Sequence, residues 1–248
     1  MPKIDLEWGS MAFTEFKGPD PPFLFLHGTG CDTADWMKTI QAIEGTCQII
    51  SVDFRGHGQS SVSRQPFTLQ DLSNDVVALV NHLKISAPIL VGRSLGGMVA
   101  MDVAQKGLKT SGLILLEGWT RLGLSSSAFN VNRVHGSLSN PEIERIRHKT
   151  ETTKARVSEK DWTFFWDSVR SFDASSFLET TSTPIFEVYG AMERTDYTER
   201  ELAVPSNPQI RWEWIPDSGH YLPHERPDAV AEICVRFRQT ISNGNQIT

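Results

Sequence analysis

A serine bracketed by glycines, directly after a short apolar run, limits what this chain can fold into more than any other feature. The run Pro88–Val91 is followed by Gly92–Gly97 (GRSLGG), and residues 98–104 have the composition of a helix. A serine on so sharp a turn between a strand and a helix needs a strained backbone, and glycines two residues to either side let the two elements pack closely around it. The motif therefore predicts that the Ser94 hydroxyl stands above a sheet, where a base can reach it.

Short apolar runs alternate with helical patterns along most of the chain. Residues 4–17 alternate well enough to form an opening antiparallel hairpin, and residues 69–83 carry apolar side chains at helical spacing. Strands buried on both faces appear as continuous apolar runs, and helices between them produce a mostly parallel sheet. The sequence therefore predicts an α/β fold. The expected strands are Phe23–Leu26, Gln48–Val52, Ile89–Val91, Gly112–Leu116, Ile185–Tyr189 and Ile210–Trp214.

One connection is much longer than the others. About 65 residues separate the run ending at Leu116 from the run beginning near Pro184, whereas ordinary connections in such folds have a few residues. Residues 141–154 and 158–169 within this segment have helical patterns, which predicts a helical lid. We expect a core domain of residues 1–118 and 184–248, a lid of residues 119–183, a helix over 227–238 and a frayed tail after Thr240.

Size and charge exclude several classes of function. The 248 residues, 39% of them hydrophobic, are enough for one large α/β domain with an insertion. The net charge is −6 and no run of Lys or Arg forms a basic stripe, so we expect neither nucleic acid nor a membrane as a partner. The N-terminus lacks the apolar core of a signal peptide, so we expect a cytoplasmic protein. Cys31, Cys47 and Cys234 lie far apart, which predicts buried thiols and no metal site.

A second glycine-rich turn follows the first apolar run. It has the sequence His27-Gly28-Thr29-Gly30. A turn of this kind at the carboxyl end of a strand exposes backbone N–H groups, which can donate hydrogen bonds to a developing oxyanion. The expected donors are the amides of Thr29 and of Leu95, the residue after the serine. The alternative is that His27-Gly28 is only a tight turn.

A third motif, Asp217-Ser218-Gly219-His220, follows the last apolar run. An ordinary serine hydroxyl is a poor nucleophile and needs a base with a pKa near neutral, which histidine supplies. We therefore expect His220 to be the base. His57 fits a role in loop architecture better, and His224 comes four residues after His220, at the start of a helix.

Together these motifs resemble the α/β-hydrolase fold family. The matching segments are His27–Gly30, Asp53–Ser60, Gly92–Gly97 and Gly219-His220 with Glu225–Pro227, in the order typical of that family. The resemblance implies an eight-stranded, mostly parallel sheet, a lid after the sixth strand and chemistry at the carboxyl ends of the strands. It also implies that residues 53–60 shape a loop, in which Arg55 would form a salt bridge.

The third member of a catalytic triad is where the sequence departs from the family. Most members resemble G-x-x-D after the seventh strand, but this chain has Glu193 at that position and Asp196 three residues later. Haloalkane dehalogenases and cofactor-free dioxygenases of this fold take the acid from the end of the sixth strand, where this chain has Glu117. Either loop can deliver a carboxylate to the histidine. Glu117 is preferred here, followed by Glu193 and Asp196, and the alternative for Glu117 is an ion pair with Arg93.

Aromatic side chains are frequent in the long insertion. Some of them are expected to pack the lid onto the core, and the remainder to line an apolar pocket for a small, uncharged, partly apolar or aromatic substrate. The expected pocket residues are Trp36, Trp119, Trp162, Phe165 and Trp166.

These observations predict a serine hydrolase of esterase or lactonase type that needs neither cofactor nor metal. Ser94 is the expected nucleophile, His220 the base and Glu117 the acid. A carbon–carbon bond hydrolase with the same triad is the nearest alternative. A cofactor-free dioxygenase and a ligand receptor without catalysis are further alternatives.

Overall fold

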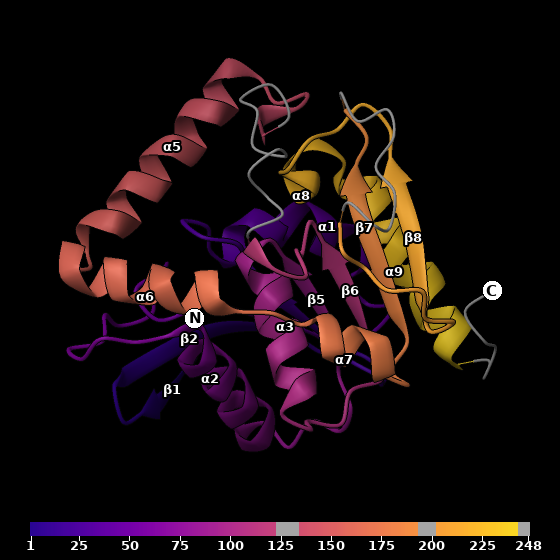
Figure 1. The fold of residues 1–248 in the computed structure, drawn as a ribbon, viewed down its shortest axis with the longest axis horizontal. Coiled ribbons are helices and arrows are strands. Elements are labelled where there is room, and N and C mark those ends of the chain that lie inside the picture. The colour runs from indigo at the N-terminus through magenta and orange to yellow at the C-terminus, as the bar shows by residue number, and fades with distance from the viewer. Residues whose placement is uncertain (123–133, 193–201, 243–248) are drawn as a thin grey trace.

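The computed structural model describes residues 1–122, 134–192 and 202–242, and within them eight strands form one sheet (Figure 1). The strand order is β1-β2-β4-β3-β5-β6-β7-β8. β2 pairs antiparallel with β1 and with β4, and the other neighbours are parallel. This confirms the predicted mostly parallel sheet with an opening hairpin. The strands are β1 (Lys3–Leu6), β2 (Gly9–Phe16), β3 (Phe23–Leu26), β4 (Ile49–Val52), β5 (Ile89–Arg93), β6 (Gly112–Leu116), β7 (Ile185–Gly190) and β8 (Ile210–Ile215).

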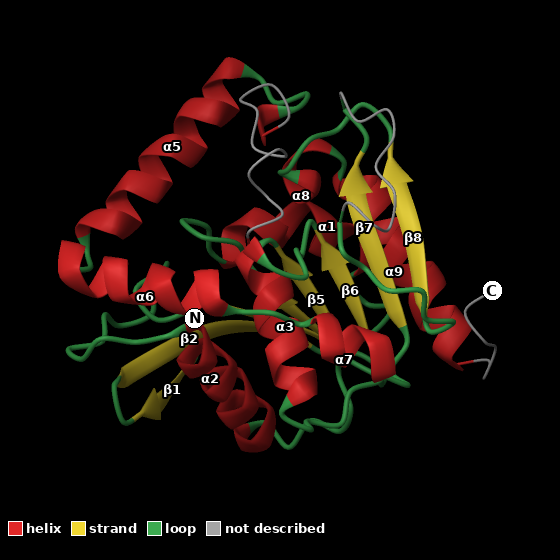
Figure 2. Cartoon of the chain, viewed as in Figure 1, coloured by secondary structure: helices red, strands yellow, loops and turns green. Residues whose placement is uncertain are grey.

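The sheet is covered on both faces because its strands are apolar on both faces. In β3, Leu24 and Leu26 belong to one hydrophobic cluster and Phe23 and Phe25 to another, since successive side chains of a strand point to opposite faces. The first cluster includes α2 and α3, and the second includes α1 and α9, so the core has three layers (Figure 2). The bounds of these helices are α1 (Met37–Ile43), α2 (Leu69–His82), α3 (Leu95–Gln105) and α9 (Pro227–Ser242).

The ends of the helices follow local chemistry. α2 begins with a capping box, in which the Thr68 hydroxyl accepts from the Asp71 amide at 3.2 Å and the Asp71 carboxylate accepts from the Thr68 amide at 2.8 Å. α9 continues to Ser242, so the expected fraying is wrong for Ile241 and Ser242. Ile241 packs against the second cluster, and this contact extends the helix. The rest of the expected tail lies outside the described residues.

The insertion after β6 is helical in its described part, as predicted. It contains α5 (Asn140–Ala155), α6 (Glu159–Ser171) and α7 (Ser175–Thr180). Phe165 and Val169 of α6 join the cluster of α2 and α3, whereas α5 stands out from the sheet (Figure 1). In the described ranges, no helix is long and apolar enough to cross a membrane.

Candidate functional site

Ser94 lies on a strained turn between β5 and α3. Its backbone has φ 52° and ψ −117°, in a region that residues with a side chain rarely adopt. A Cβ atom on Gly96 would collide with the backbone oxygen of Leu26, and one on Gly92 would collide with that of Gly96. Both glycines are therefore required for α3 to begin so close to β3 and β5. Ser94 itself is half-buried.

The turn after β3 lies against the start of α3, where a Cβ atom on Gly96 would meet the backbone oxygens of Leu26 and His27. The Cys31 N–H donates to the Gly28 carbonyl at 3.1 Å, and Gly30 has φ 72°, which a type II turn requires at its third position. Thr29 is the second residue of this turn. Leu95 occupies the first turn of α3, where helix amides lack partners within the helix. Because β3 and β5 are parallel neighbours, the turns that carry these two residues end at the same edge of the sheet.

Glu117 and His220 form a buried pair. Glu117 directly follows β6, has φ 53° and is fully buried. Its Oε1 accepts from the Gly190 N–H at 2.9 Å, and its Oε2 lies 3.5 Å from Nδ1 of His220. Catalytic hydrogen bonds are often this long before substrate binds. Of the candidate acids, Glu117 is the one that the described residues bring to His220, and Glu193 and Asp196 lie outside the described residues.

The loop that carries His220 is held by Glu225. Its carboxylate accepts from the amides of Gly219 at 2.8 Å and of Tyr221 at 2.9 Å, on both sides of the histidine. It also accepts from the Ser137 amide in the insertion at 2.9 Å. Charge-assisted bonds of this kind are shorter and stronger than neutral ones, so Glu225 fixes the backbone on both sides of His220.

Three other histidines serve the architecture of the site. The ring of His27 accepts from the Phe54 amide at 3.0 Å, and burial lowers its pKa to about 4. Burial also lowers the pKa of His57, to about 3. The Nε2 atom of His224 lies 3.1 Å from a carboxylate oxygen of Asp35. In the loop of His57, Arg55 forms the expected salt bridge, with Asp75 at 2.7 Å.

Comparison with known proteins decides the family. The sequence profile described as "Alpha/beta hydrolase family" matches residues 23–233. The chain belongs to this family. The match runs from β3 into α9 and therefore includes Ser94, Glu117 and His220.

The sequences of individual members of the family are only distantly similar to this chain. Esterase Rv0045c of Mycobacterium tuberculosis is 23% identical over 94% of this chain and 88% of the esterase. 3-Oxoadipate enol-lactonase 1 of Acinetobacter baylyi is 32% identical over 38% of this chain and 35% of the lactonase. The first curated relatives are matched over only 22% to 35% of their own length. Est816, an enzyme that degrades N-acyl homoserine lactones, has a similar fold, with a TM-score of 0.77 and 22% identity over 95% of this chain and 100% of its own.

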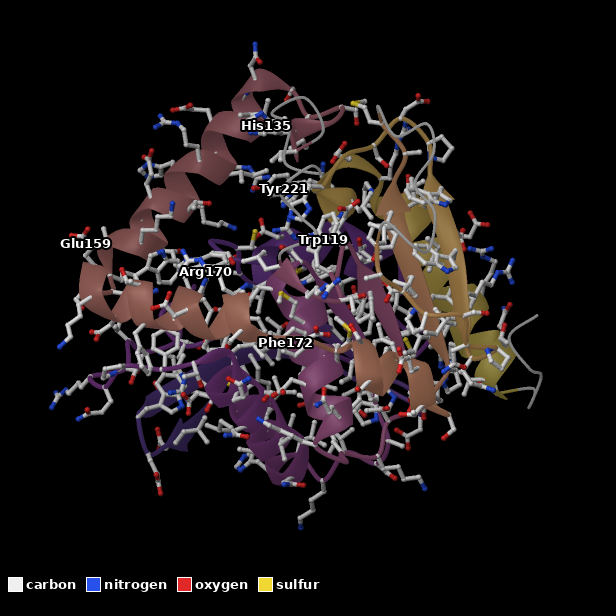
Figure 3. All side chains as sticks on the ribbon, in the orientation of Figure 1. Trp119, His135, Glu159, Arg170, Phe172 and Tyr221 are labelled. Carbon is white, nitrogen blue, oxygen red and sulfur yellow. The ribbon has the colours of Figure 1, made fainter. Side chains whose placement is uncertain are left out.

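The aromatic residues expected to line a pocket fall into two groups. Trp36 packs on Phe25, with ring centroids 4.9 Å apart, in the cluster of α1 and α9, and this position favours a packing role. Trp119 is also buried and lies against Tyr189. Figure 3 shows Trp119 and Tyr221 toward the end of the sheet where α8 (Leu222–Glu225) lies.

The second group belongs to α6. Phe165 is fully buried against Phe67, with ring centroids 5.2 Å apart. Trp162 and Trp166 are half-buried and contact both Phe165 and each other. The Trp162 ring lies 6.4 Å from that of His57. Phe165 therefore anchors the insertion, and the two tryptophans leave part of their surface uncovered.

An ionic cluster ties α5 to the short helix η1 (Thr33–Trp36). The Lys149 ammonium lies 2.9 Å from carboxylate oxygens of both Asp32 and Asp35. Burial alone would raise the pKa of Asp35, but the contacts with His224 and Lys149 hold it well below its usual range. A Cβ atom on Gly30 would collide with the Thr150 side chain, so α5 also lies directly against the turn that carries Thr29.

Sequence reasoning missed the residues whose partners are distant in the chain. Glu225 was noticed only as part of a motif, and the role of Lys149 has no local pattern. The pairing of Glu117 with Arg93 was considered, but Arg93 instead contacts His220, Cys31 and Tyr221. Within the described ranges, no group of three or more His, Cys, Asp or Glu side chains is arranged to hold a metal ion.

Proposed function

We propose that this chain is a serine hydrolase that cleaves a small, largely apolar ester or lactone without a cofactor. The observation that carries the proposal is the strained Ser94 turn at the same sheet edge as the buried Glu117–His220 pair. β3, β5 and β6 are adjacent parallel strands, so the segments that carry Thr29, Ser94 and Glu117 follow neighbouring carboxyl ends at one edge of the sheet. This arrangement supports a nucleophile flanked by oxyanion donors on one side and by an acid on the other.

The proposed reaction has two steps. His220 accepts the proton of the Ser94 hydroxyl as its oxygen attacks the substrate carbonyl, and the amides of Thr29 and Leu95 hold the oxyanion. The protonated histidine then gives its proton to the leaving alcohol. Water hydrolyses the acyl-enzyme in the second step, with His220 again as the base. Glu117 stays ionised and accepts a hydrogen bond from the Nδ1–H of His220, which orients the ring and stabilises its charged form.

The substrate class rests on the insertion and on the relatives. Trp162 and Trp166 present apolar surface from α6, which suits an acyl chain or an aromatic group better than a charged one. The relatives with esterase and lactonase activity support the same reaction type, because both cleave a carbonyl–oxygen bond. A role for Trp119 beside the substrate is part of the proposal, whereas Phe165, which is fully buried against Phe67, and Trp36 support the pocket from behind.

The proposal is tested with Ser94→Ala and a panel of aryl esters and acyl lactones. We expect kcat to fall by about 10³-fold or more while the circular dichroism spectrum stays that of the folded protein. Ser86→Ala, which changes an exposed serine before β5, is the matched control and should keep wild-type kcat. If Ser94→Ala turns these substrates over as fast as the wild type, the proposed mechanism is wrong. A parallel panel of β-diketones would identify the carbon–carbon bond hydrolase instead.

A further inference from the structure

Arg93, the residue before Ser94, contacts two loops that the chain brings in from far away. Its side chain is buried, and Nη1 donates to the His220 carbonyl at 3.4 Å. Nη2 donates to the sulfur of Cys31, also at 3.4 Å, in the turn after β3. The guanidinium carbon lies 4.4 Å from the centroid of the Tyr221 ring, which Figure 3 labels. One side chain therefore joins the end of the Ser94 strand to the base loop and to the oxyanion turn.

The oxyanion turn is shaped to receive this guanidinium. A Cβ atom on Gly28 would collide with Nη2 of Arg93, so the cation packs directly against the backbone of Gly28. Gly28 precedes Thr29, the proposed donor to the oxyanion. A shift of the guanidinium would therefore move the backbone on which this donor depends.

The positive charge of Arg93 is buried among neutral groups. Burial raises the pKa of Cys31 to about 12 and also raises the pKa of Tyr221, so both are neutral near pH 7. Asp35 is the carboxylate whose charge acts on Arg93, but it is bound to Lys149 and His224. Among the described residues, no carboxylate forms an ion pair with Arg93. Burial of a guanidinium costs desolvation free energy, which the contacts with His220, Cys31 and Tyr221 offset, so these contacts fix where the cation lies.

We propose that Arg93 is a positioning residue that holds the base loop and the oxyanion turn in place around Ser94. The inference rests on the proposed hydrolysis. Small displacements of reacting groups cost much of the rate, so the guanidinium acts through the groups that it positions.

The charge of Arg93 also lies close to the histidine, since its Nη1 donates to the backbone carbonyl of His220 itself. A nearby positive charge disfavours protonation of an imidazole, whereas Glu117, at Nδ1, favours it. Tyr221 contributes a neutral phenol to this environment, and Glu225 contributes a carboxylate that binds the amides of Gly219 and Tyr221. Removing the Arg93 charge should therefore leave His220 protonated up to a higher pH.

Three variants test this role through kcat, KM and the pH profile of kcat/KM. Arg93→Met keeps most of the length of the side chain and removes its positive charge. Arg93→Lys keeps the charge and removes the planar fork of guanidinium N–H donors. Arg55→Met removes another buried arginine, one paired with Asp75, and is the matched control for lost packing. We expect both Arg93 variants to lose kcat about tenfold or more, with KM changed less than about threefold. The acid limb of the kcat/KM profile should move to higher pH by about half a unit or more in Arg93→Met, and should not move in the other two variants.

The outcomes separate positioning from packing. The proposal is overturned if Arg93→Met keeps kcat within about twofold of the wild type. It is also overturned if Arg93→Met loses kcat but the acid limb of its kcat/KM profile stays where it is in Arg55→Met. Should Arg93→Met fail to fold, Arg93→Lys decides, because a kcat near that of the wild type would refute the need for the fork. Failure of the proposed hydrolysis would give a different result. In that case Ser94→Ala, in a chain with Arg93 unchanged, would keep its activity.

Discussion

At the scale of single residues, two of the six non-glycine residues with positive φ in the described ranges lie where the chemistry is proposed. Ser94 and Glu117 both have a positive φ, and they follow neighbouring strands of the sheet. Each such backbone conformation costs on the order of 1–3 kcal/mol of folding free energy and persists only when the surrounding structure imposes it. Close packing around Gly96 imposes it at Ser94, and the bond from the Gly190 amide helps to impose it at Glu117.

Glu117→Gln tests the assignment of the acid. The amide oxygen can still accept from the Gly190 N–H, but the negative charge that orients and stabilises the His220 imidazolium is lost. We therefore expect kcat on aryl esters to fall by about 10²-fold or more with little change in the unfolding midpoint. Steady-state kinetics and thermal unfolding measure the two effects.

Glu193→Gln and Asp196→Asn are the comparison variants for this prediction. Both should keep kcat close to that of the wild type. If either of them loses activity while Glu117→Gln stays within about threefold of wild type, the acid comes from the loop after β7.

The sequence identified some site residues better than others, for a physical reason. The Ser94 turn needs glycines within two residues, so its signal is local and could be read directly. The acid depends on which of two loops reaches His220, and that depends on contacts across 103 residues. Arg93 has partners 62 and 127 residues away, so no window of sequence could show its contacts.

At the scale of elements, the buried strands were the easiest to predict. β3 and β6 have the expected bounds, because a strand buried on both faces is a continuous apolar run that ends where polar or glycine residues begin. Helices α5 and α6 of the insertion were also expected within two residues of their observed ends, whereas the short helix α7 was not expected. Their attachment was not expected, because Lys149 meets Asp32 and Asp35 across more than a hundred residues.

Lys149→Met tests whether the ionic cluster holds α5 against η1. The change removes the ammonium from two carboxylates and leaves Asp35 with His224 and with the more distant Arg145 of α5. We expect the amides of α5 to exchange with solvent about tenfold faster, since local opening no longer has to break these ion pairs. Hydrogen exchange followed by mass spectrometry of residues 140–155 measures the effect.

Lys154→Met, on an exposed position of the same helix, is the matched control and should leave exchange unchanged. Equal exchange rates in Lys149→Met and in the wild type would show that Lys149 does not hold α5, and that packing and the contacts of Arg145 with Asp35 and His224 suffice.

At the scale of the whole molecule, one buried carboxyl group is expected to make stability depend on pH. Glu187 lies in the middle of β7, is fully buried and accepts from the Tyr189 hydroxyl at 3.0 Å. Burial raises its pKa from the ordinary 4.5 to about 8, and the charge of Glu117 adds to this rise. The folded protein therefore keeps a proton that the unfolded chain releases between these two pH values.

This proton gives a definite sign to the pH dependence. Because the folded state binds the extra proton, the free energy of unfolding should fall as pH rises from 4.5 to about 8, by at most about 1.4 kcal/mol per pH unit from this group. Glu187→Gln keeps the shape and removes the titration. Its stability relative to the wild type should therefore increase between pH 5 and pH 8, as measured by urea unfolding. A constant difference across that range would contradict the assignment.

The three-layer architecture is the feature of the whole molecule that the sequence predicted most fully. Alternation of apolar runs and helices predicted the parallel sheet, and the resemblance supplied the eight strands and the place of the insertion. The titration of the buried Glu187 carboxyl could not be predicted. The apolar residues on either side of Glu187 are enough to predict the strand, and they do not show how the carboxyl is surrounded in the fold.

Covalent labelling with a fluorophosphonate tests the central claim most directly, because the reagent reacts with a serine only when a base activates it. Intact mass and peptide mapping should show one adduct, on Ser94, in the wild type and none in Ser94→Ala. Labelling of His220→Ala should be slower by about 10²-fold or more. An adduct on another residue, no adduct, or an equal rate in His220→Ala would contradict a hydrolase built on Ser94.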